Sequence, residues 1–368
     1  MTHRRLPLIL SLLWVLFLAG GTVGQQAPSQ ALAGRLVEVK VPAPSLKGNL
    51  LGDPIEQNVA IYLPPSYDTL PAKRFPTVYL LHGFLGDGTA WTNGSYQGLR
   101  LGPSMDELIR SGKSREMIIV APSARNAYAG SFYSNSVVTG NWEDYILHDV
   151  ISYVDANYRT LARPQSRGIA GHSMGGYGAV VLGMKHPDIF AAIYALSPCC
   201  LGLEGDLSAE NPAWLKVLHL TSKEQLKPQP QSLDDFYSLA FVALSAALSP
   251  NPGHGPFLVD FPFEERDGRL ERNLIAYTKW MAKLPLYMID ENKDNLLKLR
   301  GIFLDYGQEE PFSSIRMSTR LFSLALAERG IPHTFEIYEG GNHNNKIRQR
   351  FETRLVQFFS ETLDFGSQ

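Results

Sequence analysis

The chain has 368 residues, of which 44% are hydrophobic and 19% are charged, and its formal net charge is −2 at pH 7. Acidic and basic residues are interspersed, which argues against nucleic acid as a partner, because that role needs a strongly basic surface. The two cysteines, Cys199 and Cys200, exclude a disulfide framework. No histidine pair or cysteine spacing indicates a metal site, and nothing in the sequence requires a cofactor.

The amino terminus has the composition of an export signal. Arg4 and Arg5 form a positive start, and residues 6–19 are mainly apolar. This apolar run is too short for a stable membrane span, and small residues follow it. We therefore expect a signal peptide over residues 1–24, a flexible tail over residues 25–34, and a secreted or periplasmic protein. The oligomeric state stays open.

Four strands are predicted in the first third of the chain. Residues 35–42 and 57–63 alternate in polarity, whereas residues 75–81 and 116–121 are continuous apolar runs typical of buried strands. Residues 143–158 carry an apolar stripe with helical spacing, which indicates a helix packed on the core.

Two candidate substrate contacts lie just before this helix. Residues 128–136 form a polar and aromatic segment that could line the leaving-group side of a site, and Asn135 belongs to it. Trp142 opens the helix and could touch substrate, although a tryptophan in that place is also a common packing residue.

A G-x-S-x-G pentapeptide, Gly171-His172-Ser173-Met174-Gly175, is the strongest catalytic signal. It follows a strand-like run at residues 167–170 and precedes an apolar helix over residues 177–186. A serine on such a turn is strained and exposes its hydroxyl, and the glycines allow the strand and helix backbones to approach closely. The alternative is a chance glycine-rich turn. The motif predicts Ser173 as a nucleophile.

An oxyanion hole follows from the same geometry. One backbone N–H is expected from Met174, the residue after the nucleophile, where a helix begins. The second donor is expected in the loop of residues 82–86, directly after the strand of residues 75–81. His82 is interpreted as a structural residue of this loop.

Residues 201–300 interrupt the alternation of strands and helices. They contain an apolar helix-like run at residues 239–248, a turn-rich break at residues 249–256, and an amphipathic stretch at residues 274–284. Because this segment follows the nucleophile, we expect it to fold over the site as a cap. Phe257, Phe261 and Phe263 would supply either a substrate pocket or the cap's own core. Cys199 and Cys200, just before it, are expected to be buried free thiols near the pocket floor.

A catalytic serine needs a histidine as its base and a carboxylate that orients this histidine. In α/β-hydrolases, the carboxylate follows the serine in the chain, and the histidine follows the carboxylate. His343 lies in a loop after the predicted strand of residues 334–338, whereas His333 lies at the opposite end of that strand and is interpreted as structural. Residues 301–307 predict the preceding strand. Its exit carries three competing carboxylates, Asp305, Glu309 and Glu310, which spacing alone does not separate.

The alternation of strands and helices over residues 75–200 and 301–364 predicts an α/β fold with a mostly parallel, doubly wound sheet. Residues 35–200 and 301–368 would form one catalytic domain, and residues 201–300 its cap-like insertion.

From about residue 50 onward, the sequence resembles the esterase family that includes S-formylglutathione hydrolases, feruloyl and acetylxylan esterases, enterochelin esterases and mycolyltransferases. The resemblance is carried by short motifs at residues 79–84, 140–145, 158–160, 171–176, 305–310 and 341–343. It implies an α/β-hydrolase fold, with Glu310 as the triad acid, Asp305 in support, and the Phe84 N–H as the second oxyanion donor. Most members have Asp at the acid position, whereas mycolyltransferases have Glu.

These observations predict a serine carboxylesterase that works through an acyl-enzyme with Ser173, His343 and Glu310. An acyltransferase of the same fold and a non-catalytic binding domain are the alternatives. The substrate is expected to be a small-molecule or polysaccharide-linked ester, and its acyl and alcohol groups stay open.

Overall fold

The computed structural model describes residues 33–366, so the predicted signal peptide and most of the predicted tail lie outside the described residues. Within this range, an 8-stranded sheet has the order β1-β2-β4-β3-β7-β8-β11-β12. Its strands are β1 (Arg35–Pro42), β2 (Glu56–Leu63), β3 (Thr77–Leu81), β4 (Ile118–Pro122), β7 (Arg167–His172), β8 (Ala192–Leu196), β11 (Gly301–Gly307) and β12 (Thr334–Tyr338). The pairs β1–β2 and β2–β4 are antiparallel, and the other pairs are parallel.

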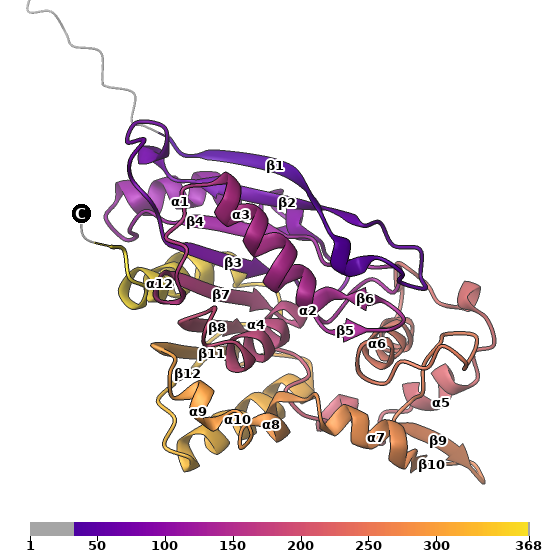
Figure 1. The fold of residues 1–368 in the computed structure, drawn as a ribbon. Coiled ribbons are helices and arrows are strands. Elements are labelled where there is room, and N and C mark those ends of the chain that lie inside the picture. The colour runs from indigo at the N-terminus through magenta and orange to yellow at the C-terminus, as the bar shows by residue number, and fades with distance from the viewer. Residues whose placement is uncertain (1–32, 367–368) are drawn as a thin grey trace, which may run out of the picture. The chain divides into compact units, whose positions relative to one another are not determined.

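Helices cover both faces of this sheet (Figure 1). One face packs against α3 (Ile151–Asn157), α4 (Met174–Lys185) and α10 (Ser313–Glu328), and the other against α1 (Leu101–Arg110) and α12 (Val356–Thr362). The central strands β3, β4, β7 and β8 are buried along their whole length, as the continuous apolar runs predict for β3 and β4. The predicted doubly wound α/β fold is therefore confirmed.

The predicted helix at residues 143–158 is continuous but not regular. It consists of α2 (Trp142–Asp144), a π-helical segment η4 (Tyr145–Val150) and α3. A second π-helical segment, η8 (Phe351–Leu355), joins α11 (Ile347–Arg350) to α12. The remaining short elements of the sheet region are η1 (Pro44–Leu46), η2 (Pro65–Tyr67), η3 (Gly88–Trp91), β5 (Asn135–Ser136), β6 (Gly140–Asn141) and η5 (Pro164–Ser166).

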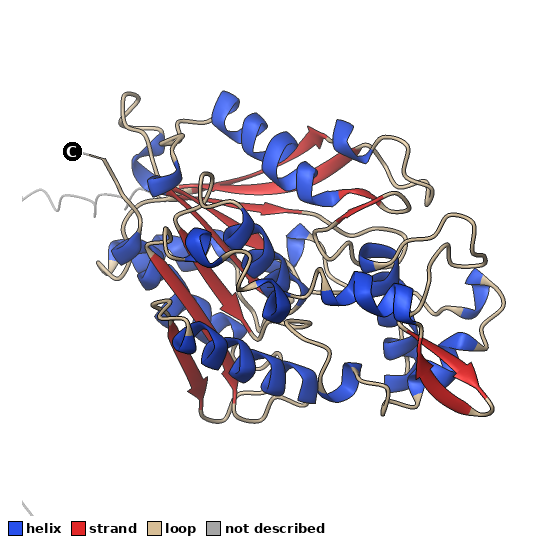
Figure 2. Ribbon diagram, turned by 60° about the horizontal axis from the view of Figure 1, so that its bottom comes forward, coloured by secondary structure: helices blue, strands red, loops and turns tan. Residues whose placement is uncertain are grey.

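Residues 201–300 connect β8 to β11 and lie beside the ends of the strands, as Figure 2 shows. Their longest helix, α6, starts at Leu233, six residues before the predicted run, because the Ser232 side chain caps it by accepting the Asp235 N–H. In chain order, the elements of this segment are η6 (Gly205–Leu207), α5 (Ala213–Leu218), η7 (Lys223–Gln225), α6 (Leu233–Leu248), β9 (Phe263–Arg266), β10 (Arg269–Arg272), α7 (Leu274–Met281), α8 (Pro285–Met288) and α9 (Lys293–Leu296). The β9–β10 hairpin is not predicted from the sequence.

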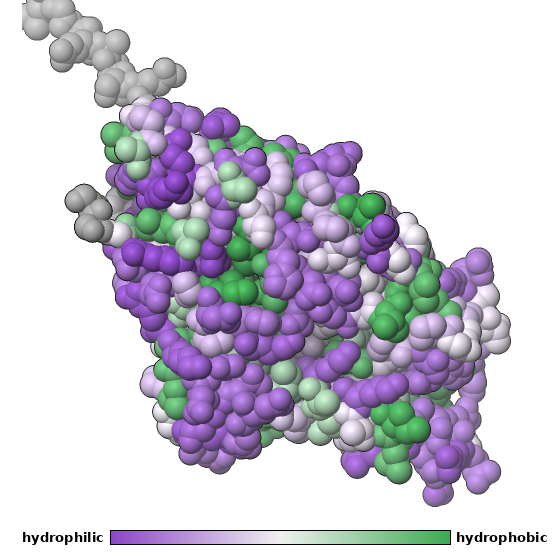
Figure 3. Space-filling model, viewed as in Figure 1, coloured by the Kyte–Doolittle hydropathy of each residue, from purple (hydrophilic) through white to green (hydrophobic). Residues whose placement is uncertain are grey.

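The residues from Ala33 onward form one compact unit. The face seen in Figure 3 is mainly hydrophilic, with separate apolar areas. Within residues 33–366, no helix combines the length and the apolar character needed to cross a bilayer.

Candidate active site

Ser173 lies between β7 and α4 in a left-handed backbone conformation, with φ of 57° and ψ of −116°. The two flanking glycines allow this turn: a Cβ on Gly171 would lie 2.3 Å from the Gly175 backbone, and one on Gly175 would lie 2.2 Å from Leu81 O. Ser173 keeps 8% of its surface exposed and lines a pocket. The elbow geometry expected from the sequence is therefore present.

Glu310 and His343 are brought together by the last two strands of the sheet. Glu310 follows β11, His343 follows β12, and the two loops touch where Glu309 N–H donates to Gly341 O at 2.7 Å. His343 Nδ1 donates to Glu310 Oε2 at 2.8 Å, and the Glu310 side chain is fully buried. This bond fixes the imidazole tautomer and leaves Nε2 to accept a proton.

The structure also separates the three competing carboxylates. Glu309 is exposed to solvent. Asp305 is fully buried on β11, where its Oδ2 accepts hydrogen bonds from Arg350 Nη2 at 2.6 Å and from the Tyr194 hydroxyl at 2.6 Å. Of the three, Glu310 alone contacts His343, and Asp305 instead ties α11 to the sheet.

The link between Ser173 and His343 runs through the residue before the serine. His172 Nε2 donates to the His343 carbonyl at 2.8 Å, and the centres of the two rings are 4.6 Å apart. Among the described residues, no hydrogen bond joins Ser173 Oγ to His343. Catalytic hydrogen bonds of this kind often form fully only when substrate is bound.

His172 is a residue whose role the sequence analysis did not find. Its burial, together with the neighbouring His343, lowers its pKa well below the ordinary value, so the ring is neutral. A neutral ring can hold the His343 loop by a hydrogen bond without opposing a positive charge on His343, which the expected role as base requires. The position of His172 inside the elbow motif, next to Ser173, was the one feature of the sequence that pointed to this role.

We expect His172→Phe to lower the turnover number about tenfold, because the His343 loop would lose a hydrogen bond that holds it, and a small displacement of the base slows catalysis. Phenylalanine keeps an aromatic ring but removes the donor to the His343 carbonyl. The measurement is kcat and KM on one ester, with thermal unfolding to verify the fold. His333→Phe is the matched control, since His333 bonds Ser323 and Ile331 at the other end of β12. An unchanged kcat in His172→Phe would refute the positioning role.

The two expected oxyanion donors, Met174 N–H and Phe84 N–H, belong to segments next to Ser173. Met174 N–H begins α4, where the first N–H groups have no partner within the helix. Phe84 N–H makes no hydrogen bond to the described residues, and a Cβ on the adjacent Gly83 would lie 3.4 Å from Ser173 Cβ. Both N–H groups are thus available beside the nucleophile.

The loop that carries Phe84 is held by His82 and Tyr96. His82 Nε2 accepts the Ala124 N–H at 2.8 Å, and His82 Nδ1 donates to Gly83 O at 2.8 Å. Burial lowers the pKa of His82 to about 4, so the imidazole ring is neutral and can both donate and accept these hydrogen bonds. The Tyr96 hydroxyl accepts the Gly83 N–H at 2.8 Å. These contacts support the structural role expected for His82.

The pocket beside Ser173 has mainly apolar and aromatic walls. It encloses about 450 Å³ of empty space, its open mouth included. The lining residues come from loops of the sheet region and from the insertion, chiefly α6, and the main lining side chains are Phe84, Phe132, Phe236, Tyr237, Leu244 and Phe312. The Phe84 and Phe132 rings stack with centres 5.8 Å apart, and Phe236 stacks on Phe312 at 5.5 Å. We call this cavity the aromatic pocket.

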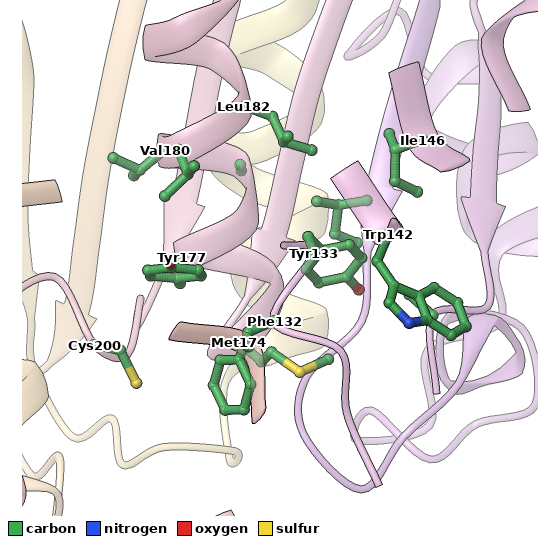
Figure 4. Close-up of a cluster of buried hydrophobic side chains, with 14 of the residues drawn as sticks. Phe132, Tyr133, Trp142, Ile146, Met174, Tyr177, Val180, Leu182 and Cys200 are labelled. Carbon is green, nitrogen blue, oxygen red and sulfur yellow. The ribbon is translucent and has the colours of Figure 1, made fainter. Parts of the chain in front are cut away.

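Two predicted substrate contacts lie elsewhere. Trp142 is fully buried, donates its indole N–H to Thr139 O at 2.7 Å, and lies apart from Phe132 and Met174 in Figure 4. The structure therefore places it as a packing residue. Asn135 exchanges hydrogen bonds with Asp144 and lines a different cavity, together with Tyr177 and Lys283. Neither residue lines the aromatic pocket.

The three phenylalanines of the insertion also lie outside the aromatic pocket. Phe261 and Phe263 pack against Trp214 with ring centres 6.2 and 5.1 Å away, and Phe257 packs against Phe261 at 6.5 Å. They form the insertion's own core, which was one of the two expectations. Other insertion residues line the pocket instead, among them Asp206 and Leu207 in η6 and Phe236, Tyr237 and Leu244 on α6.

An elbow serine, a paired histidine and carboxylate, and a mostly parallel sheet together define the α/β-hydrolase fold class. The Esterase family matches residues 54–360 of the chain. The protein therefore belongs to the Esterase family.

Relatives and solved structures agree with this class. An esterase of Mycobacterium tuberculosis is 32% identical over 138 residues, which is 36% of this chain and 27% of that protein. An endo-1,4-beta-xylanase/feruloyl esterase of Xylanibacter ruminicola is 32% identical over 139 residues, 36% of this chain and 18% of that protein. The chain thus matches less than a third of the length of these relatives.

Solved structures show the same fold. A ferulic acid esterase superposes with a TM-score of 0.61 and 21% identity, covering 90% of this chain and 100% of its own. An S-formylglutathione hydrolase from Agrobacterium tumefaciens has a TM-score of 0.59 and 16% identity, covering 91% of this chain and 97% of its own.

Proposed function

We propose that the protein is a serine esterase in which Ser173 attacks the ester carbonyl and forms an acyl-enzyme that water then hydrolyses. His343 takes the serine proton and returns it to the leaving alcohol, and Glu310 orients the imidazole and stabilises its charge. The N–H groups of Phe84 and Met174 would bind the oxyanion. The observation that carries this proposal is the 2.8 Å bond between buried Glu310 and His343, beside the strained Ser173 elbow.

The aromatic pocket suggests the acyl group. Its apolar walls lie directly beside Ser173, so an apolar or aromatic acyl group would bury its surface there while its carbonyl faces the nucleophile. One polar group at this pocket is Asp206, which accepts the Tyr237 hydroxyl at 2.5 Å and the Ser314 N–H at 2.5 Å. We infer that esters of apolar or aromatic acids are better substrates than acetyl esters, and that feruloyl esters are one member of this class.

A panel of esters that vary in acyl and alcohol group tests this proposal, combined with labelling by a fluorophosphonate. Labelling at Ser173 with hydrolysis of the aromatic esters is the expected result. Absence of labelling in the folded protein would reject the proposed nucleophile. Addition of alcohol or sugar acceptors separates hydrolysis from acyl transfer, which the glutamate at the acid position keeps as the second candidate.

Phe236→Ala should change the ranking of substrates. Removing this wall of the aromatic pocket is expected to lower kcat/KM for an aromatic acyl ester by roughly 10–200-fold relative to an acetyl ester. The comparison of the two esters is the measurement. Phe261→Ala is the control, since Phe261 packs on Trp214 outside the pocket. Equal losses on both esters in Phe236→Ala would mean that Phe236 only maintains the fold.

We also propose that the protein is secreted or periplasmic. The support is the composition of residues 1–24, with Arg4 and Arg5 before an apolar run. Sequencing the amino terminus of protein recovered outside the cytoplasm tests this: a terminus between residues 19 and 25 is expected, and retention of residue 1 would reject it.

A further inference from the structure

The chain's two cysteines are neighbours in the wall of the aromatic pocket. Cys199 and Cys200 follow β8, both line the pocket together with Ser173, and their sulfur atoms are 2.9 Å apart. Both are free thiols; Cys200 is buried, whereas Cys199 is partly exposed. Figure 4 shows Cys200 at the same end of α4 as Phe132, on a different segment of the chain. The proposed mechanism uses neither thiol.

This segment is joined directly to the nucleophile elbow. Cys199 N–H donates to the Ser173 carbonyl at 3.1 Å, so a shift of the Cys199 backbone acts on the residue that carries the reactive hydroxyl. On its other side, Leu201 O accepts the Leu286 N–H at 2.8 Å and ties the segment to α8. Cys200 itself has a left-handed backbone with φ of 57°. The two cysteines therefore lie in a loop whose backbone is held by hydrogen bonds on both sides.

Adjacent cysteines suit a reversible bond better than a permanent one. Neighbouring Cα atoms in a trans chain are about 3.8 Å apart, closer than the roughly 4.4–6.8 Å of ordinary disulfides. A disulfide between them is strained and is reduced more readily. Structural disulfides avoid this geometry, whereas regulatory ones can use it.

We propose that Cys199 and Cys200 form a dithiol modification site that low-molecular-weight disulfides oxidise to a reversible disulfide, and that this oxidation slows the reaction at Ser173. The effect on turnover rests on the proposed function, whereas the thiol chemistry does not.

The burial of the two thiols sets the order of the steps. The Cys199 thiolate attacks one sulfur of oxidised glutathione, forms a mixed disulfide and releases one glutathione thiolate. Burial raises the pKa of the Cys200 thiol, so Cys200 is the poorer first nucleophile and acts second. It loses its proton to solvent and attacks Cys199 Sγ, which releases the second glutathione. The two electrons and two protons of the dithiol thus convert one glutathione disulfide into two thiols.

Ring closure changes the pocket wall beside the nucleophile. It draws together two sulfurs that line the cavity and constrains the Cys199 peptide that bonds Ser173 O. A displacement of the elbow by a fraction of an ångström is expected to lower the turnover number about tenfold.

The test treats the reduced full-length chain with excess oxidised glutathione and follows mass and free thiols. The expected product is lighter by two hydrogen atoms and has no free thiol, and dithiothreitol restores both. Because the chain has no other cysteine, an intramolecular disulfide must join this pair. Cys200→Ser should stop at the glutathione adduct, and Cys199→Ser should react far more slowly. Thiols that stay free in the wild type, while unfolded protein reacts, would overturn the proposal.

Turnover is measured on the same samples with an aromatic acyl ester. The expected result is the tenfold loss after oxidation, full recovery after reduction, and no response to glutathione in the Cys199→Ser/Cys200→Ser double variant. A disulfide that forms without any change in turnover would overturn the regulatory part. If the reduced protein hydrolyses no ester, the proposed function has failed, and the mass and thiol results still decide the modification site.

Discussion

Ser173→Ala is expected to lower ester turnover by roughly 10⁶-fold, the loss typical of serine hydrolases whose nucleophile is removed. The alanine keeps the backbone of the elbow but has no hydroxyl to form an acyl-enzyme. Because Ser173 is almost entirely enclosed between β7 and α4, removal of one oxygen should disturb the fold little.

The measurement is steady-state turnover on the best ester of the panel, together with fluorophosphonate labelling and thermal unfolding. Ser95→Ala, on an exposed loop, is the matched control. Substantial hydrolysis by a folded Ser173→Ala protein would refute the serine mechanism as a whole.

Glu310→Gln should be the next most damaging change, with a loss of about 10⁴-fold in kcat. Glutamine keeps the size of the side chain but removes the charge that orients His343 Nδ1–H and stabilises the imidazolium. The midpoint of unfolding should move much less than the rate. Glu309→Gln, one residue earlier and exposed, is the matched control and should leave kcat near the wild-type value.

The variant Asp305→Asn tests whether Asp305 has a structural role, in contrast to the catalytic role proposed for Glu310. It weakens a buried ion pair with Arg350, and breaking such a pair typically costs about 3–5 kcal/mol of folding stability. We therefore expect Asp305→Asn to affect unfolding first and activity second, the reverse of Glu310→Gln. A larger loss of kcat in Glu309→Gln than in Glu310→Gln would show that the acid is assigned wrongly.

The sheet and the order of the proposed catalytic residues could be predicted because both depend on local patterns. Continuous apolar runs predicted β3 and β4, and the elbow pentapeptide predicted the position of Ser173. The choice of Glu310 over Glu309 came from the resemblance and not from the pattern, since two adjacent carboxylates in one loop look alike until the fold exposes one and buries the other.

The pocket walls and the positioning histidine could not be predicted in this way. Phe236 and Phe312 stack although 76 positions separate them in the chain (312 − 236), and no local spacing encodes that meeting. The same holds for Phe257, Phe261 and Phe263, whose aromatic sequence is equally compatible with a pocket or with a core. Trp142 is similar: its side chain is buried by residues that approach it only in the folded protein.

The contact between the insertion and the loop that carries Glu310 has a consequence for how the sequence of this protein can change in evolution. Phe236 and Leu244 belong to one continuous stretch of the chain, whereas Ser173, Glu310 and His343 all lie outside it. Descendants could therefore exchange part of the wall of the aromatic pocket by replacing a single gene segment, with Ser173, Glu310 and His343 inherited unchanged. Asp206 limits that freedom, since it bonds the Ser314 N–H just beyond the acid loop. A viable exchange must keep this contact and the other hydrogen bonds that tie the segment to the sheet region, such as those from Ser136 to Ala246 O and from Tyr177 to Lys283 O.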